Sequence, residues 1–535
     1  MSAPDLLEPA RQRLQRHFGY AQFRALQARV IGALHEGRDV LAVLPTGGGK
    51  SICFQVPALL QSAPTLVVSP LISLMQDQVA AAKARGIAAA ALNSTLTPAA
   101  QRHLLAQVAG GQLRLVYTSP ERLPRLAADL ADLEIRPALL AVDEAHCISE
   151  WGPDFRPAYR ALRRFRAALG WPQAIALTGS ATPAVRRDIT RVLGLGGARG
   201  LRQVLGSFDR RNLWFGVVRV RDEGARLHAL LSLLRMQDAL AIVYAPTRNL
   251  VEELARVVGD AGFRAAPYHA GLAPPLRQAV LQRFLSDELN VVVATCAFGM
   301  GIDKPNVRLV VHWTLPATPE AYYQEAGRAG RDGSFARCVL LYRPGDATMP
   351  RRQLDVTFPP EALARQVWQG ELSPDRVPAN LRSSIERLHR ELRPERGPVC
   401  WDAVRERRQA AAARIAVMEN YATRRRCRRT ALLEYFGEQV PRCAGCDVCS
   451  PRQFDRPSSR PADRVAARRL TRLRLALASR HTPWGGCILE PQVLRRLAED
   501  PPATEATLAA VEGVGPVLSR KYSRTILTAL EVLGR

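Results

Sequence analysis

Short apolar runs alternate with longer segments of helical pattern through the first third of the chain. Each run is long enough for one strand buried on both faces, and each intervening segment has room for a covering helix. The alternation therefore predicts an α/β domain, with a mostly parallel sheet between two helical layers. The five runs are VLAVL (40–44), TLVVS (65–69), RLVYT (114–118), ALLAV (138–142) and AIALT (174–178).

The first apolar run leads directly into a glycine-rich turn, PTGGGKS (45–51). Consecutive glycines let backbone amides approach a phosphate chain, a lysine supplies charge for its outer phosphates, and a serine hydroxyl can hold magnesium. Leu44 replaces the first glycine of the usual phosphate-loop pattern, so a chance turn is the alternative. We predict an ATP-binding loop formed by Thr46, Gly47, Gly48, Gly49, Lys50 and Ser51.

Two adjacent carboxylates and an aromatic segment follow the fourth run. Asp143 and Glu144 stand at the predicted carboxyl end of a strand, where ligands bind to sheets of this kind. Asp143 is expected to hold magnesium, and Glu144 to orient and deprotonate the attacking water. The irregular segment that follows suits stacking of unpaired bases, although a packed loop is the alternative. Its candidate nucleic-acid contacts are Trp151, Phe155 and Arg156.

After a glycine-rich boundary at 194–200, a second set of apolar runs predicts a second lobe of similar architecture but without its own phosphate loop. Two lobes with one nucleotide site imply a cleft that closes on ATP. Arg328 and Arg331 are expected on one helical face, where guanidiniums could neutralise the transferring phosphoryl group. A solvated arginine pair is the alternative. The runs are WFGVVR (214–219), LAIVY (240–244), VVVA (291–294), RLVVH (308–312) and CVLLYR (338–343).

Four of the ten cysteines form the pattern C-x15-C-x2-C-x2-C, and they are Cys427, Cys443, Cys446 and Cys449. Four thiolates at this spacing make a closed tetrahedral zinc site, which is structural because no ligand position is left for water. A disulfide pair or free thiols are the alternative. The six scattered cysteines are expected to be buried small hydrophobes.

The chain is strongly basic, with 75 Lys and Arg against 49 Asp and Glu, a formal net charge of +26. Such a surplus commonly neutralises phosphates, so it predicts a nucleic-acid partner, although an arginine-rich solvated surface is the alternative. The amino terminus has no apolar core of signal-peptide length, and no run could span a bilayer. We therefore expect a cytoplasmic protein with no membrane partner.

Several of these segments resemble the successive motifs of a superfamily-2 helicase, and specifically of the RecQ family. They are TGGGKS (46–51), SPLISLMQDQV (69–79), TSPERL (118–123), VDEAHCISEWGPDFRP (142–157) and TGSATP (178–183). The upstream FGYAQFRALQ (18–27) is similar to the family's adenine-reading motif. That resemblance implies that Gln27 bonds the adenine edge and that Tyr20 and Arg24 pack on its ring. Glu150 and Pro153 depart from the glutamine and histidine common in the family.

The resemblance implies two RecA-like lobes, at 1–200 and 201–346, followed by helical modules. A basic helical insertion would occupy 347–416, either as a scaffold or as a nucleic-acid arm, and a zinc-binding subdomain would occupy 417–452. A linker at 453–463 would lead to an HRDC-like helical bundle at 464–535. No room remains before this bundle for the winged-helix domain that many members of the family carry.

In function, the resemblance implies an ATP-dependent 3′ to 5′ DNA helicase of repair and recombination, with ATP, magnesium and zinc as cofactors. Single-stranded and forked DNA would be its partners, single-strand-binding or recombination proteins are further candidates, and we expect a nucleoid-associated monomer. Thr295 would contact DNA phosphate, and Gln324 would lie beside the two arginines at the lobe interface. An RNA-dependent ATPase and a non-catalytic annealing factor that switches with ATP are the rivals.

Overall fold

The computed structural model describes residues 7–45, 48–93, 96–149, 156–236, 240–299, 304–392, 397, 399–439 and 442–451, with short pieces between 497 and 530. None of the helices in these parts of the chain is long and apolar enough to cross a membrane. The predicted linker and most of the predicted carboxyl-terminal bundle lie outside the described residues. Within that predicted bundle, the structure describes one helix with both of its ends, α20 (Glu505–Ala509).

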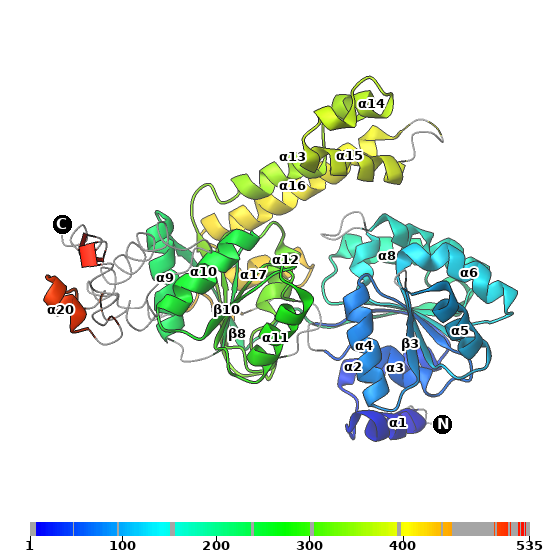
Figure 1. Ribbon diagram of the computed structural model, residues 1–535. Coiled ribbons are helices and arrows are strands. Elements are labelled where there is room, and N and C mark those ends of the chain that lie inside the picture. The colour runs from blue at the N-terminus through cyan, green and yellow to red at the C-terminus, as the bar shows by residue number, and fades with distance from the viewer. Residues whose placement is uncertain are drawn as a thin grey trace.

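The first lobe is a parallel sheet in the order β3-β4-β2-β5-β6-β1-β7, with helices on both sides (Figure 1). Its central strands are apolar because they are covered on both faces. The strands are β1 (Asp39–Val43), β2 (Thr65–Val68), β3 (Ala89–Leu92), β4 (Leu115–Thr118), β5 (Leu139–Val142), β6 (Gln173–Thr178) and β7 (Leu201–Leu205). The helices are α1 (Glu8–Phe18), α2 (Ala25–His35), α3 (Ile52–Ala58), α4 (Ile72–Ala84), α5 (Pro98–Ala109), α6 (Leu123–Asp132), α7 (Leu162–Ala168) and α8 (Pro183–Leu193).

The second lobe repeats this plan around a parallel sheet in the order β10-β11-β9-β12-β13-β8. Its strands are β8 (Leu213–Arg219), β9 (Ala241–Tyr244), β10 (Ala265–Tyr268), β11 (Val291–Ala294), β12 (Leu309–His312) and β13 (Ala336–Tyr342). Its helices are α9 (Glu223–Met236), α10 (Arg248–Asp260), α11 (Pro274–Leu285) and α12 (Pro319–Ala326). The predicted α/β class with two RecA-like lobes is therefore confirmed.

All ten predicted runs form strands, but the structure adds β3, β7 and β10. Because β7 pairs in parallel with β1, the first sheet continues to Leu205. The predicted lobe boundary at residue 200 therefore falls one strand too early. The glycine-rich stretch before β7 is a turn within the first lobe, and the link between the two sheets is residues 206–212.

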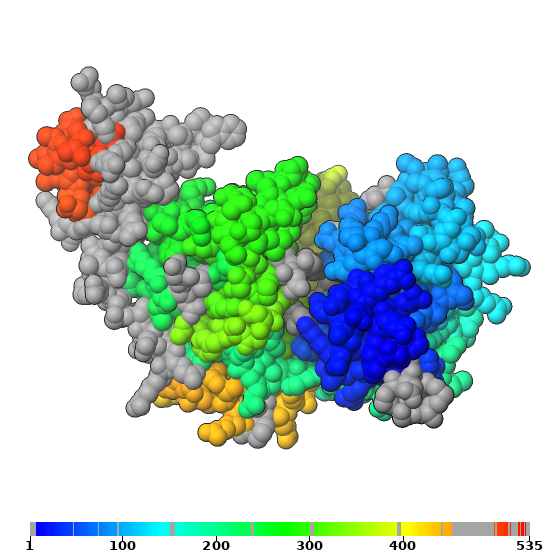
Figure 2. Space-filling model, turned by 90° about the horizontal axis from the view of Figure 1, so that it is seen from below, coloured from blue at the N-terminus to red at the C-terminus, as the bar shows by residue number. Residues whose placement is uncertain are grey.

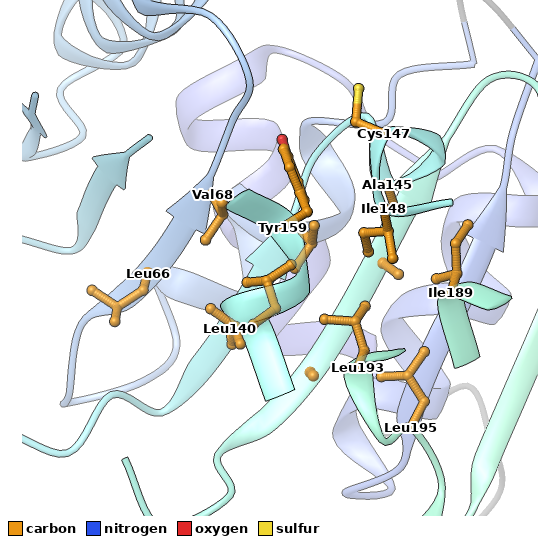
Figure 3. Packing of buried hydrophobic residues seen from close by; sticks show 14 of the residues in the cluster. Leu66, Val68, Leu140, Ala145, Cys147, Ile148, Tyr159, Ile189, Leu193 and Leu195 are labelled. Atoms are coloured by element: carbon orange, nitrogen blue, oxygen red, sulfur yellow. The ribbon is translucent and has the colours of Figure 1, made fainter. Parts of the chain in front are cut away.

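The segment after β5 is fixed by the core of the first lobe. Figure 3 shows Leu140 of β5 together with Ile148 and Tyr159 from the turns that follow it, and Ile189 of α8, all within one buried cluster. Ile148 is 1% exposed and Tyr159 is completely buried. This packing anchors both ends of the loop that carries the candidate base-stacking residues.

A helical arm rises from the second lobe and extends toward the first, so that α14 and α15 lie above α8 in Figure 1. It consists of α13 (Thr348–Thr357), α14 (Glu361–Trp368), α15 (Ala379–Leu392) and α16 (Trp401–Thr423). The arm has a small core of its own, in which Trp368 stacks on Trp401 at 5.4 Å between ring centroids. We call these four helices the arm.

Residues 424–451 follow the arm and contain the four clustered cysteines; we call them the zinc-binding region. They join the second lobe through α17 (Arg428–Tyr435). A parallel bridge pairs Cys446 with Phe215 of β8, the edge strand of that sheet. In Figure 2 the first lobe, in blue to cyan, lies beside the green second lobe, with gold residues of this region at the edge of the second lobe. The cysteine cluster is thus an extension of the second lobe.

Candidate active site

The glycine-rich turn begins where β1 ends and closes at Ser51, the residue preceding α3. Thr46 and Gly47 lie outside the described residues. Gly49 has a left-handed backbone (φ 70°), and a Cβ there would lie 2.4 Å from the Gln27 amide nitrogen. Only glycine fits this position, because any side chain would be strained and would displace Gln27.

Gln27 is buried beside this turn and is hydrogen-bonded to its backbone. It is 3% exposed, and its amide nitrogen donates to the carbonyls of Gly48 and Gly49, both at 3.2 Å. Its amide oxygen accepts from the backbone of Arg24 at 3.0 Å. Both ends of the amide are engaged, so an adenine edge would have to replace the bonds to the turn. Tyr20 is 58% exposed and stands open to stacking.

The two carboxylates after β5 have different surroundings. Asp143 is buried and accepts hydrogen bonds from the side chain of Gln78 and the backbone of Glu144, each at 3.0 Å. A Glu144 oxygen lies 3.8 Å from the Lys50 amine, so the carboxylate faces the glycine-rich turn. The arrangement places an acidic pair and a lysine at the carboxyl edge of the first sheet.

These surroundings shift the two pKa values in opposite directions. Burial raises the pKa of Asp143, and the charge of Glu144 raises it further. Burial alone would also raise the pKa of Glu144, but Lys50 and His146 lower it to about 2. Glu144 is therefore ionised at neutral pH.

A hydrogen-bonded series connects Glu144 to the second lobe. The ring nitrogen Nδ1 of His146 lies 3.3 Å from Glu144 and 3.1 Å from the Thr178 hydroxyl. That hydroxyl accepts from the backbone of Ser180 at 3.2 Å, and the Ser180 hydroxyl accepts from Gln324 of α12 at 2.7 Å. Sequence reasoning selected Gln324 but missed Thr178 and Ser180 as its partners, although both lie within TGSATP.

Arg328 and Arg331 do not lie on a helical face, which corrects the sequence prediction. Helix α12 ends at Ala326, and both arginines belong to the turn that follows it. Arg210 of the interlobe link donates to the carbonyls of Gly327, Ala329 and Gly330 at 3.2, 3.1 and 2.7 Å. A residue far away in sequence thus fixes the shape of the arginine-bearing turn.

Arg328 influences a carboxylate of the first lobe. Its guanidinium bonds the carbonyl of Gly299, and its charge contributes, after Lys50 and His146, to the lowered pKa of Glu144. The two lobes therefore present opposite charges to one another around Glu144.

Of the candidate nucleic-acid contacts, Trp151 and Phe155 lie outside the described residues. Arg156 donates to the carbonyl of Pro70 at 2.6 Å. Thr295 follows β11, is half-buried, and accepts at its hydroxyl from the backbone of Ala297 at 3.4 Å. His269 is 3% exposed and lies 3.0 Å from Glu252.

The four clustered cysteines converge on one point. Their sulfur atoms all lie within 4.8 Å of one another, and those of Cys427 and Cys446 are 3.9 Å apart. Tetrahedral zinc with bonds of about 2.3 Å requires sulfur separations of about 3.8 Å, so the geometry fits that ion.

Among the scattered cysteines, Cys296 and Cys400 are exposed, which corrects the expectation that they are buried.

The arginines beside Cys427 divide into two groups. Arg428 and Arg429 are buried, and they pair with Asp447 and Asp209. Their charges are therefore used within the protein. The exposed members are Arg424, Arg425 and Arg426.

The zinc-binding region also holds the interlobe link. Phe208 of the link stacks on Phe436 at 4.5 Å between ring centroids, with the planes 8° apart. The carboxylate of Glu438 accepts from the Phe208 backbone at 2.6 Å, and the Tyr323 hydroxyl donates to the Phe208 carbonyl at 2.8 Å. We call Phe208, Tyr323, Phe436 and Glu438 the hinge cluster. Sequence reasoning missed it, because its members are distant along the chain.

Two parallel-sheet lobes that face one another across a single glycine-rich turn define a two-lobed RecA-like motor. The chain matches family models described as DEAD/DEAH box helicase at 24–191, helicase conserved C-terminal domain at 225–333, RecQ zinc-binding at 382–450 and HRDC domain at 463–530. The zinc-binding match begins at 382, so much of the predicted insertion at 347–416 belongs to that unit.

Two curated relatives show the family. ATP-dependent DNA helicase RecQ of Haemophilus influenzae is 39% identical over 442 residues, which are 82% of this chain and 63% of that protein. Probable ATP-dependent DNA helicase RecS of Bacillus subtilis is 41% identical over 63% of this chain and 67% of that protein. The chain therefore belongs to the RecQ family of helicases.

The matched region spans 63% and 62% of the length of two RecQ relatives, so the comparison covers only part of them. Among solved structures, that of the DUF1998 helicase MrfA bound to DNA has a TM-score of 0.53 at 19% identity, and covers 65% of this chain and 52% of that one. At this identity the likeness supports the fold.

Proposed function

We propose that this protein is an ATP-dependent DNA helicase that moves 3′ to 5′ along a single strand and separates duplexes in DNA repair and recombination. The observation that carries the proposal is the setting of Glu144. This carboxylate faces Lys50 of the glycine-rich turn and is influenced by the charge of Arg328 from the other lobe. The resemblance to RecQ helicases supports DNA as the substrate and 3′ to 5′ as the direction of movement.

In this proposal, ATP binds with its phosphates on residues 46–51 and its adenine beside Tyr20, Arg24 and Gln27. Ser51 and Asp143 would hold magnesium, which supplies charge neutralisation at the outer phosphates. Glu144 accepts a proton from the attacking water, while Lys50 stabilises the phosphate oxygens. Arg328 and Arg331 stabilise charge on the transferring phosphoryl group, and Gln324 reports lobe closure to Ser180.

Single-stranded DNA would cross both lobes through Trp151, Phe155, Arg156 and Thr295. Zinc would be held by the four clustered cysteines and would stabilise the fold without entering the reaction. The names of both curated relatives, which include the words DNA helicase, support this substrate class.

The substitution Glu144→Gln tests the catalytic assignment. The amide keeps the shape of the side chain but cannot accept the proton of water, so turnover should fall by about 1,000-fold or more while ATP still binds. ATP hydrolysis and the binding of a fluorescent ATP analogue would be measured together. Persistence of turnover, or loss of nucleotide binding, would contradict the assigned role.

Strand separation on 3′-tailed, 5′-tailed and forked duplexes tests the polarity and the substrate. We expect unwinding with a 3′ tail or a fork, and stimulation of ATP hydrolysis by single-stranded DNA above that by RNA. Unwinding only with a 5′ tail would overturn the direction, and equal stimulation by RNA would favour an RNA-dependent ATPase. Strand annealing that survives Glu144→Gln without any unwinding by the parent protein would favour the annealing factor.

A further inference from the structure

A long cavity of about 2020 Å³ lies between the second lobe and the arm. Its floor includes the ends of β8, β9 and β12, and its wall includes residues of α13 and α16. Pockets for small molecules have volumes of about 300 to 1,000 Å³, so the size suits an extended polymer. We call this cavity the arm groove.

The arm groove is positively charged. Its lining contains eight arginines and five carboxylates among the described residues. One pair, Arg226 with Asp346, is buried and neutral within the lobe. On the arm side, Arg387 and Arg407 share one carboxylate, that of Glu391, at 2.7 and 3.0 Å. Arg343 pairs with Glu223 at 3.3 Å. With Glu391 included, eight arginines face six carboxylates, and this smaller surplus of cations favours a polyanion.

The chemistry of the lining favours a phosphate backbone over stacked bases. Phe358 is the ring on the arm side, and the guanidinium of Arg407 covers it at 5.9 Å from the ring centroid. Trp313 on the floor is 4% exposed. Because these rings are covered while arginines such as Arg221 and Arg352 are exposed, recognition should depend on charge and not on base sequence.

The groove begins at the proposed DNA track. Its lining includes Cys296, the neighbour of Thr295, and residues Pro246 and Thr247 that follow β9. A strand that contacts Thr295 would therefore lie next to the groove. Helix α13, which carries Arg352, lies between the two matched family regions that end at 333 and begin at 382.

We propose that the arm groove binds the sugar-phosphate backbone of a single DNA strand that extends beyond the motor across the second lobe. This inference rests on the proposed function and adds a binding site to it. It also assigns a role to the arm, which holds the strand while the two lobes act on the part between them.

The test replaces two exposed arginines of the groove, in the double variant Arg221→Gln with Arg352→Gln. The control is Arg376→Gln with Arg390→Gln, which removes the same charge from exposed arm positions outside the groove lining. Thermal melting establishes that both proteins fold. Binding is then measured by fluorescence anisotropy, with single strands of increasing length and a range of salt concentrations.

We expect the unchanged protein to gain affinity as the strand becomes long enough to leave the motor. The groove variant should lose about tenfold in affinity for the long strand. The slope of its log affinity against log salt concentration should become shallower by about 1.4, or about 0.7 per lost phosphate contact. Its affinity for the shortest strand should match that of the control. A blunt duplex of equal length should show no such loss.

Equal affinity and salt dependence of the two variants for the long strand would overturn the inference, as would an equal loss with duplex. ATP hydrolysis stimulated by the short strand separates this result from failure of the proposed function. If that stimulation is present in both variants, the motor assignment stands on its own. If the unchanged protein shows none, the proposed function itself fails.

Discussion

At the scale of single residues, Gln27 has two tasks that compete for one amide. In the structure the amide bonds the carbonyls of Gly48 and Gly49, whereas the family resemblance assigns it to the adenine edge. Both tasks can be reconciled if adenine replaces a bond to the turn, which would couple base recognition to the shape of the phosphate loop.

Replacing Gln27 by alanine should therefore raise KM for ATP by about tenfold, the worth of one good hydrogen bond, and abolish preference for ATP over GTP. The measurement is steady-state hydrolysis of both nucleotides with saturating single-stranded DNA. The replacement Arg29→Ala, at an exposed position on the same helix, serves as the control. An equal rise in KM for ATP and GTP would show that Gln27 only supports the turn.

The charged and polar residues of the site were accessible from the sequence because they lie within short ordered motifs. Asp143 and Glu144 directly follow a strand of clear pattern, and Lys50 lies in the glycine-rich turn after another. Gln78 was not singled out, since a glutamine on a helix gives no sign that it will bond the buried Asp143. Likewise, nothing in the sequence places Arg210 beside the turn that carries Arg328.

At the scale of elements, the turn after α12 depends on a partner from the interlobe link. Arg210 donates to three carbonyls of that turn, so its loss would leave the turn free to shift, although Arg328 and Arg331 themselves remain unchanged. Arg210→Ala should lower kcat by about 10- to 100-fold, since a small displacement of catalytic groups is costly.

The binding of ATP should change little in this variant, because the residues of the first lobe are untouched. Arg210→Lys should recover little activity, since an ammonium cannot reproduce the guanidinium fork. The exposed neighbour Arg211 offers a matched alanine control. Loss of kcat and nucleotide affinity together in Arg210→Ala would contradict a role confined to the turn.

The contact between the zinc-binding region and the first lobe depends on Gly437. This glycine has φ 79°, and a Cβ there would lie 2.7 Å from Pro183 at the start of α8. Gly437→Ala should therefore lower the free energy of unfolding by about 1 to 3 kcal/mol through strain and overlap.

Gly370→Ala is the matched control, because it has nearly the same backbone angle, φ 77°, but open space around its Cβ. It reports the backbone strain alone, and the difference between the two variants isolates the contact with Pro183. Chemical denaturation of both proteins gives the comparison. Equal destabilisation by the two substitutions would show that the zinc-binding region does not contact the first lobe at Pro183 in solution.

The three strands that the sequence did not reveal are all at sheet edges. An edge strand has one unpaired side, so it tolerates residues that a central strand excludes. The strand β3 is mostly alanine, β7 contains exposed Arg202 and Gln203, and β10 contains Pro267. Their patterns therefore resemble helix or loop, and only the pairing of the sheet identifies them.

At the scale of the whole molecule, zinc should stabilise more than the region that binds it. Arg429, next to Cys427, pairs with Asp209 of the interlobe link, and Asp447 within the cluster pairs with Arg428 and with the backbone of β8. Removal of zinc by a strong chelator should lower Tm and ATP turnover together.

The measurement combines release of about one zinc per chain, detected by a metal-sensitive dye, with thermal melting and hydrolysis assays. Addition of zinc should restore both properties, whereas added magnesium should not. Cys400→Ser, an exposed cysteine outside the cluster, provides the control. Unchanged turnover after complete zinc release would contradict the coupling.

The arm could be anticipated as helical, but its purpose could not, because its arginines are accompanied by nearly as many acids. Exposed pairs such as Arg351 with Glu419 and Arg408 with Asp355 bind the arm to itself. Only the three-dimensional arrangement shows which arginines face the second lobe and which face solvent.

The hinge cluster has a mechanical consequence. Residues 206–212 connect the two sheets. Phe436 stacks on Phe208 of this link, and Glu438 bonds its backbone, next to the helix that carries Gln324. If the lobes close and reopen on ATP as proposed, these contacts would hold residues 206–212 in one place while the lobes move. Each cycle of the proposed ATP hydrolysis would then start from the same arrangement of the link.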